Sequence, residues 1–529
     1  MALLPYSGPW GWDQAAHLMR RSTFGATKAQ IDAAVVAGLS GTLTSLFTVN
    51  SLNQPLTVDP AEQIAPMGQT WVDKVLPAGS KTATESARQT SMRAWMVERF
   101  RVNDGTIVEK MCVFWQNHFA NAAVFDARAT YHYHMLLRQF ALGDVKQFVK
   151  ELTISPSMLI FLSGQSNNVY SPNENFAREL LELFTVSKGA QVGVGDYTNY
   201  TETDISQSSK IFTGWYSNNL WSETDPTVSS IFEPTYHDNS TKTLGAAFGN
   251  GVISPVGANE YLNYIDLIFA SNATSQSIAL FLSRKLYRYF VNYDITPLVE
   301  STVIIEMANQ LIADNYVIEN TVKALLGSDH FYDSTMRGTM IKNPLEFVTS
   351  VINTTQMTSS LTVPETYSLN NEIYWSIASL GMYPLDPPNV GGWFAYYQAP
   401  AFTRLWANST YLKNRFNFSS WLAYWSGYDI NGTIVNIDVL AFVATLSVPN
   451  DPNVVIDELV LLFFPKDITA IRKLALKNIL TSGLPDFEWT NEYNDYIANN
   501  SNPTYVDPVR NRLKLLLHKM LRFPEFQLQ

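Results

Sequence analysis

The stretch Pro-Asn-Glu-Asn-Phe-Ala-Arg-Glu-Leu-Leu-Glu-Leu-Phe-Thr, residues 172–185, combines a helical pattern with a dense set of polar side chains. At about 100° per residue, its apolar side chains from Phe176 to Phe184 share one side of a helix. Asn173 is suited to cap the start of this helix, and Glu174 lies near its positive end. The polar side chains gather on the opposite side: Asn175, Arg178, Glu179 and Glu182.

This polar face has two interpretations. Four polar groups on one helix face could form a site that binds a ligand or performs chemistry. Alternatively, the face is simply solvated, with Arg178 and Glu182 paired four residues apart. Periodicity alone favours the solvated face.

The same helical spacing extends outward from this stretch in both directions and predicts a mainly α, multi-helix globular protein. Predicted helices include 12–20, 28–37 ending at Gly38, 84–101, 106–119, 127–140, 259–269, 276–290, 298–314, 318–326, 344–355 and 508–521. Residues 187–255 are instead rich in Gly, Asn, Ser and Thr and predict a small β and loop-rich insertion. We expect a main helical domain over 1–426, with 427–529 as a C-terminal helical extension packed on the same body.

Composition limits the classes of function. The net charge of −11 argues against a nucleic-acid partner, because phosphate binding needs a basic surface. No apolar stretch is long enough to predict a transmembrane segment, and residues 1–6 lack the pattern of a secretory signal. The single cysteine, Cys112, lies in an apolar run and is predicted to be a buried thiol.

Two further clusters could carry chemistry. Phe-Trp-Gln-Asn-His-Phe at 114–119 places Trp115 and His118 on a helix, where a lone histidine on an apolar stripe is more often a hydrogen-bonded core residue than a ligand. His237 and Asp238, followed by Lys242, lie in a polar loop and could bind a metal or orient a base, although a turn is the simpler interpretation. The sequence contains no His-Glu-x-x-His, Cys-x-x-Cys, Gly-x-Ser-x-Gly or P-loop pattern.

These clusters occur together in an order that resembles the bacterial domain-of-unknown-function 1800 family. The most specific match is 172–185, and 114–119 resembles the family's Phe-Trp-x-Asn-His-Phe block. Further blocks that resemble the family are 16–27, 200–204, 213–215, 237–245, 387–393 and 524–526. The resemblance therefore covers nearly the whole chain.

No activity is established for that family, so the resemblance implies a setting and not a reaction. Its members are commonly encoded beside proteins that resemble sulfatases and carry export signals. The resemblance therefore implies a secreted or cell-surface location, with a sulfatase-like partner or self-assembly as the expected interaction.

Two functions from different classes follow as hypotheses. In the first, an exported or cell-surface protein binds a partner protein or a polymer, and the expected binding residues are Asn173, Asn175, Arg178, Trp115, Trp215 and Lys242. In the second, a metal-assisted hydrolase acts on an extracellular polymer. It would hold a divalent metal ion with His118 and His237, and use Glu179, Glu182 and Asp238 as catalytic residues in the same pocket. Binding is the slightly favoured hypothesis.

Overall fold

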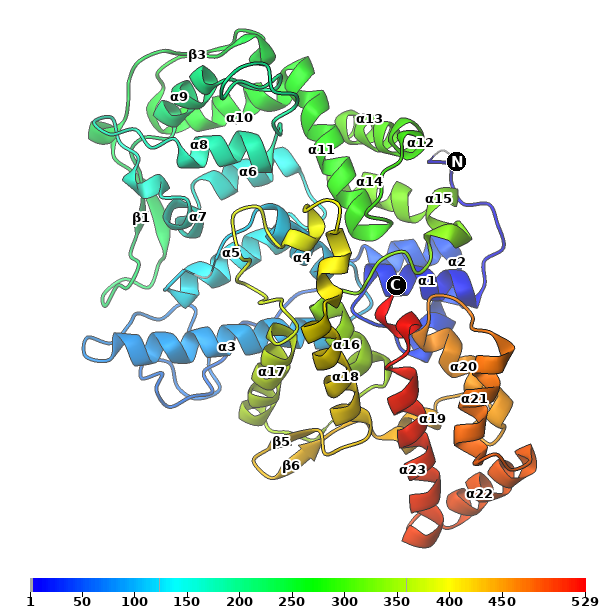
Figure 1. Cartoon of the computed structure of the whole chain (residues 1–529). Coiled ribbons are helices and arrows are strands. Elements are labelled where there is room, and N and C mark those ends of the chain that lie inside the picture. Colours follow the sequence, from blue (N-terminus) through cyan, green and yellow to red (C-terminus); the bar gives the residue numbers. More distant parts are fainter. Residues whose placement is uncertain (1–2, 123, 358) are drawn as a thin grey trace.

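The computed structural model describes residues 3–122, 124–357 and 359–529. Helices account for 57% of the chain and small strand pairs for 6%, which confirms the predicted mainly α fold. Figure 1 shows helices packed against other helices, with no sheet as a layer of the fold. The described strands form only two-stranded antiparallel pairs.

The N-terminal part contains five helices: α1 (Trp12–Ser22), α2 (Lys28–Leu46), α3 (Lys81–Val102), α4 (Val108–His118) and α5 (Ala127–Gln139). The side chain of Thr27 caps α2 by accepting from Gln30 N, and Gln30 returns the interaction in a capping box. The predicted stop at Gly38 appears as a kink with φ +69° inside a helix that continues to Leu46. Only glycine adopts this backbone conformation without strain, so Gly38 changes the direction of the chain.

The middle of the chain holds short helices and the predicted β and loop-rich insertion. The helices are α6 (Val145–Thr153), α7 (Pro156–Phe161), α8 (Asn175–Glu179) and α9 (Glu202–Ile211). Strand β1 (Trp215–Asn218) pairs with β2 (Ser229–Phe232), and β3 (Lys242–Thr243) pairs with β4 (Val252–Ile253). The insertion 187–255 therefore contains two small hairpin-like pairs and ordered loops, together with the helix α9 that its composition did not predict.

Helices of between 3 and 19 residues follow this insertion and build the centre of the molecule. They are α10 (Glu260–Ala270), α11 (Asn272–Phe290), α12 (Pro297–Val299), α13 (Ile305–Ala313), α14 (Ile318–Leu326), α15 (Asp329–Tyr332), α16 (Pro344–Thr354), α17 (Val363–Ala378) and α18 (Ser409–Ala423). Asn343 caps α16 through a capping box with Glu346, and Pro344 occupies the first turn, where its missing N–H costs nothing.

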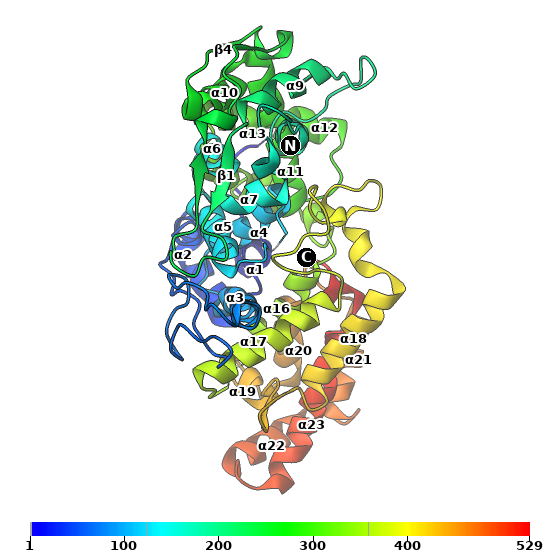
Figure 2. The same ribbon diagram turned by 90° about the vertical axis from the view of Figure 1, so that its left-hand side faces the viewer.

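The C-terminal part begins with β5 (Tyr428–Ile430) paired to β6 (Thr433–Val435). Five helices follow: α19 (Val439–Val443), α20 (Pro452–Phe463), α21 (Ala470–Thr481), α22 (Asp486–Ala498) and α23 (Pro503–Met520). Figure 2 shows an elongated molecule, with α9 and α10 at one end and α22 at the other. Buried side chains of α20 and α23 belong to the same hydrophobic cluster as those of α1 and α4.

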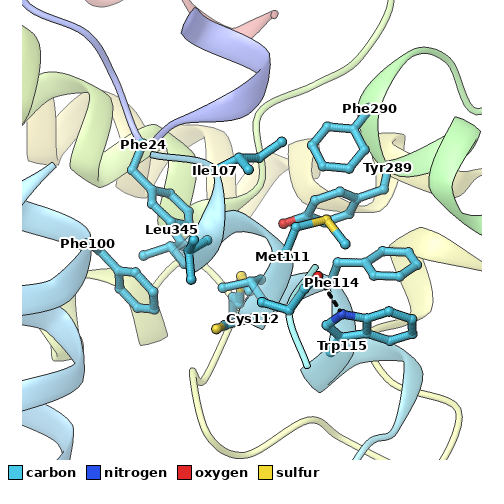
Figure 3. Packing of buried hydrophobic residues seen from close by; sticks show 14 of the residues in the cluster. Phe24, Phe100, Ile107, Met111, Cys112, Phe114, Trp115, Tyr289, Phe290 and Leu345 are labelled. Atoms are coloured by element: carbon cyan, nitrogen blue, oxygen red, sulfur yellow. Dashed lines mark hydrogen bonds between the residues drawn. The ribbon is translucent and has the colours of Figure 1, made fainter. Parts of the chain in front are cut away.

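Helix α4 lies in the middle of this cluster, and all of its residues are buried. Figure 3 shows its side chains Met111, Phe114 and Trp115 among aromatic and aliphatic neighbours from other elements, including Phe24 and Tyr289. Cys112 is buried there as predicted, and burial raises the pKa of its thiol well above the usual value. The residues at the end of α4 are consequently held in fixed positions.

A helix can cross a membrane only if it is long enough and apolar enough. No single helix among the described residues combines sufficient length with sufficient apolar character. The sharply bent pair formed by residues 257–270 and 272–290 satisfies both criteria only when the two helices are taken together.

Candidate functional site

The stretch 172–185 begins as an α-helix and changes to a π-helix at Leu180. Helix α8 covers Asn175–Glu179, and the π-helical turn covers Leu180–Phe184. The N-cap of α8 is Glu174, without a cap hydrogen bond from its side chain, and not Asn173 as predicted; Asn173 Oδ1 accepts from Asn175 N at 2.9 Å just before the helix. The apolar side is buried as the periodicity predicts, with Phe176, Leu180 and Phe184 in the core. Single π-turns of this kind occur frequently at functional sites.

The polar side of this segment makes different pairs from the one expected. Arg178 donates to both carboxylate oxygens of Glu202, at 2.7 and 2.8 Å, and to Glu174 at 3.3 Å. The predicted pair of Arg178 with Glu182 is therefore wrong. Glu182 instead accepts from the Tyr200 hydroxyl at 3.1 Å and pairs with Lys188 at 2.5 Å. The π-turn adds residues per turn and so rotates Glu182 away from the α-helical position that the prediction assumed.

Glu179 lies half-buried on the polar side of this segment. Burial raises its pKa above the usual value, and the nearby Glu182 carboxylate adds to the effect. Arg178 and Lys188 oppose this shift. Within the described chain, its side chain accepts no hydrogen bond and forms no ion pair. Glu179 could therefore hold and release a proton, as a general acid must.

His118 is fixed at the end of α4 by contacts on both ring nitrogens. Nε2 lies 3.0 Å from the carbonyl oxygen of Phe184, and Lys285 Nζ lies 2.8 Å from Nδ1. Because a carbonyl oxygen can only accept, the assigned tautomer carries its proton on Nε2 and accepts from Lys285 at Nδ1. Burial lowers the pKa of His118 well below its usual value, and Lys285 contributes next. Neither nitrogen has a free lone pair for a metal ion.

The surroundings of Lys285 favour its neutral amine over the ammonium ion. Burial lowers its pKa to about 7, and the charge of Arg288 adds to the effect. Its ammonium group also lies 4.5 Å from the ring centre of Phe281. The sequence analysis did not identify Lys285, because nothing in its local pattern marks it as a partner of a histidine 167 residues away.

His237 belongs to a second buried network, beneath the β-rich insertion. Its Nε2 lies 2.9 Å from Glu260 Oε1, and its Nδ1 lies 2.9 Å from the carbonyl oxygen of Thr213. Lys242 donates to the other carboxylate oxygen of Glu260 at 2.6 Å. Both ring nitrogens of His237 are occupied by oxygen partners within the protein, so neither is available to a metal ion. The network anchors the insertion on α10.

The remaining predicted residues of this region shape the loop and its packing. Asp238 Oδ1 accepts from Ser240 N at 2.8 Å, in the turn that the simpler interpretation anticipated. Although burial works in the opposite direction, hydrogen bonds from Ser240 hold the pKa of Asp238 below its usual value. Trp215 packs edge-on against Tyr261, with ring centres 5.5 Å apart. The Trp115 indole donates to the Ala141 carbonyl at 3.1 Å in the core.

The predicted metal ligands consequently lie in separate networks. His118 contacts the π-turn and α11, whereas His237 contacts Thr213 and α10. In residues 3–122, 124–357 and 359–529, no group of three or more His, Cys, Asp or Glu side chains is arranged to hold a metal ion. No hydrogen bond or ion pair among the described residues joins His118 to Glu179, Glu182, His237 or Asp238, and the single pocket of these five residues stays a prediction.

A wide cavity lies next to the end of α4, which sequence reasoning did not identify as a site. Its volume is about 660 Å³, within the usual range for ligand pockets. We call it the aromatic cavity and define it by its lining: Ala122, Phe161, Gly381, Tyr383, Asp386, Pro387, Pro388, Asn389, Trp393, Phe394, Ala395, Gln398, Leu405, Trp406, Asn408 and Tyr411. Four residues of the family block 387–393 belong to this lining: Pro387, Pro388, Asn389 and Trp393.

The lining presents aromatic rings together with uncharged polar groups. The indole N–H groups of Trp393 and Trp406 are buried and have no hydrogen-bond partner within the described chain. The Gln398 side chain is exposed and makes no hydrogen bond with the described residues. Asp386 is the one acidic residue of the lining, and burial raises the pKa of its carboxyl group. The lining contains no lysine, arginine or histidine.

The aromatic density of residues 383–420 is the sequence signal that could have marked them as a candidate site. Trp393, Phe394, Trp406 and Tyr411 fall within nineteen positions of one another, far above what a solvated connection needs. The sequence could not show that they share a cavity, because Phe161 and Ala122 complete it from distant parts of the chain.

The fold and this site define a large, mainly α protein that combines a buried central helix with an aromatic cavity. The chain belongs to the family described as Protein of unknown function (DUF1800), whose model matches residues 17–528. The match covers nearly the whole chain and confirms the resemblance seen in its sequence blocks. No curated protein and no solved structure matches the chain.

Proposed function

We propose that this protein binds a neutral carbohydrate polymer, with a short run of sugar units seated in the aromatic cavity. The observation that carries the proposal is the combination of aromatic rings and side-chain amides in a cavity without cationic side chains. Sugar rings present apolar C–H faces that pack on aromatic rings, and hydroxyl groups that both donate and accept hydrogen bonds.

The polar groups of the lining match a hydroxyl-rich ligand. The exposed amide of Gln398 offers both a donor and an acceptor. Asn408 uses its Oδ1 to cap α18 at Tyr411 N, which leaves its amide N–H₂ for a ligand. The Asp386 carboxyl group can accept from a hydroxyl group, and its raised pKa also allows it to donate when protonated.

An anionic polymer fits this cavity less well. Sulfated or uronic-acid chains need arginine or lysine partners, and the lining supplies none. A metal-assisted hydrolase has no comparable support, because both ring nitrogens of His118 and of His237 are already engaged. Binding is therefore the function that the geometry supports best.

Location and partners belong to the same proposal. A secreted or cell-surface position would bring the cavity to the polymers of a cell wall or matrix. Fractionation of the native host, with an antibody against this chain, tests that position. Purification from the same host tests for a sulfatase-like partner or for self-assembly, either of which could share the polymer with the cavity.

The binding experiment compares the wild-type chain with two matched variants. Tyr383 lines the cavity and Tyr424 lies outside it, and each is 45% exposed. We expect native gels containing neutral glucans to retard the wild-type chain and the Tyr424→Ala variant. Tyr383→Ala should weaken binding about tenfold, or roughly 1.4 kcal/mol. Equal retardation of both variants, or stronger retardation by alginate than by any neutral glucan, would contradict the proposal.

A further inference from the structure

A cluster of buried positive charge lies between the first and last parts of the chain. Helices α1, α4, α16 and α18, with the segment before α16, bring together five cationic side chains around the carboxylate of Glu346. Asp13 adds a second carboxylate near Arg20, which is only half-buried. The cations are Arg20, Arg21, Lys110, Lys342 and Arg415. Buried charges are normally paired, because an isolated ion in a protein interior costs several kcal/mol.

Both oxygens of the Glu346 carboxylate already have partners within the protein. Lys110 forms an ion pair with Glu346 Oε1. Glu346 Oε2 accepts from Asn343 N at 3.0 Å and from Gln529 Nε2 at 2.8 Å. Glu346 therefore compensates about one of the five positive charges, and its oxygens have little capacity for another cation.

Three of the other cations are held by neutral groups. Arg21 donates to Met336 O at 3.0 Å, and Arg415 donates to Lys342 O at 2.7 Å. Arg20 donates to the carbonyl oxygens of Leu461 and Leu462, near the end of α20. Carbonyl oxygens satisfy the N–H donors but do not neutralise the charge. The region keeps an excess of positive charge.

Lys342 is the cation without a polar partner. Its side chain is buried, at 4% exposure, and its ammonium group makes no hydrogen bond or ion pair with the described residues. The group lies 3.8 Å from the ring centre of Phe526. Burial holds the pKa of Lys342 well below its usual value, and Arg20 contributes next. The Nε atom of Arg20 is also buried without a hydrogen-bond partner among the described residues.

Lys342 and Arg20 line a small cavity together with Glu346, Phe526 and Gln529. The space available to the centre of a water-sized particle is about 20 Å³, enough for one such particle. The hydroxyl-bearing residues Thr23, Ser350 and Thr354 also line it. The cavity is thus small, and its largely apolar wall contains the cationic side chains of Lys342 and Arg20.

We propose that this cavity is a binding site for one small monovalent anion of the size of chloride, held between Lys342 and Arg20. A halide fits the available space, accepts from the Lys342 ammonium and from Arg20 Nε, and offsets part of the excess charge. Larger anions such as sulfate exceed the space. The site joins the opening block 16–27 to the closing block 524–526, and it is independent of polymer binding in the aromatic cavity.

The test measures thermal unfolding of the full chain at pH 7 and constant ionic strength, with sodium gluconate replaced stepwise by sodium chloride. We expect chloride to raise Tm by about 2 °C when its concentration is about 100 times Kd. Lys342→Met should remove this shift, because the thioether fills the same space without a charge. Lys323→Met is the matched control and should keep the shift, since Lys323 pairs with Glu319 away from the cavity.

A second measurement does not depend on the variant folding. Crystals of the wild-type chain soaked in sodium bromide should show an anomalous-scattering peak between Lys342 and Arg20. The proposal is overturned if chloride and gluconate give the same Tm for the wild-type chain, if Lys342→Met retains the chloride shift, or if bromide occupies no position in this cavity.

Discussion

The main-chain N–H of Trp393 donates to the side-chain Oδ1 of Asn117 at 2.9 Å, across 276 residues of sequence. This hydrogen bond attaches the block 387–393 to the end of α4. The next residue of α4, His118, contacts the carbonyl oxygen of Phe184 in the π-turn. The end of α4 therefore positions both the aromatic cavity and the segment 172–185, which are distant in the sequence.

The first prediction concerns this hydrogen bond. Asn117→Ala removes the acceptor and leaves the buried N–H of Trp393 without a partner, which costs about 1–3 kcal/mol. We expect the free energy of unfolding in urea to fall by that amount. We also expect the affinity for a neutral glucan to fall, because Trp393 lines the cavity. A variant that unfolds at the wild-type urea concentration would show that the bond does not hold the block in place.

The second prediction concerns the close approach of Gly392 to α4. Its φ is +85°, and a Cβ atom there would lie 2.4 Å from Asn117 O. Gly432 has a similar φ of +87°, but an added Cβ atom would meet nothing within 4 Å, so Gly432 isolates the cost of backbone strain. Gly432→Ala should cost about 1–2 kcal/mol. Gly392→Ala should cost several kcal/mol, because the clash is added to the strain. If the two variants lose the same free energy of unfolding in urea, α4 shifts to accommodate the added Cβ atom at little cost.

The helical pattern predicted most of the fold, because the periodicity of helices such as α11 and α14 reports directly which face is buried. It could not predict the change from α to π geometry at Leu180. That change accompanies a tertiary contact, in which His118 takes the carbonyl oxygen of Phe184 as its acceptor. An α-helical wheel therefore placed Glu182 beside Arg178, whereas Glu182 contacts Tyr200 and Lys188.

The candidate site was less predictable than the fold, for a physical reason. The sequence showed that His118 and His237 were unusual but not which groups they contact, and both use their ring nitrogens within the protein. The cavity linings bring together side chains from distant segments, such as Phe161 and Trp393 in one cavity and Arg20 and Lys342 in the other. Local spacing carries no information about such pairs.

The third prediction concerns stability in acid. Burial lowers the pKa of His134 to about 3, and both of its ring nitrogens lack hydrogen-bond partners within the described chain. The unfolded chain binds this proton near pH 6.5, so stability is fully present above that pH and is lost as the pH falls toward about 3. His134 alone contributes a slope of about 1.4 kcal/mol per pH unit in this window.

His134→Phe should flatten that slope in urea unfolding measured at pH 4.5, 5.5 and 7.5. His132→Phe, on the exposed side of the same helix, is the control and should change the slope less, because His132 is only partly buried. An unchanged slope in His134→Phe would show that His134 is protonated in the folded protein.

The fourth prediction concerns Glu85, whose pKa is raised to about 7 by burial, with the Asp126 carboxylate as the next cause. The folded protein therefore binds this proton more tightly than the unfolded chain, which releases it near pH 4.5. The contribution to stability is present below about pH 4.5 and is lost as the pH rises through 7.

Glu85→Gln removes the ionisation but keeps an oxygen that can accept from Ala127 N, as Oε1 does at 2.6 Å. We expect the variant to exceed the wild-type chain by about 3 kcal/mol more at pH 8 than at pH 4.5. Glu98→Gln makes the same substitution at a half-buried position of the same helix and serves as the control. An equal gain at both pH values for Glu85→Gln would mean that Glu85 ionises freely in the fold.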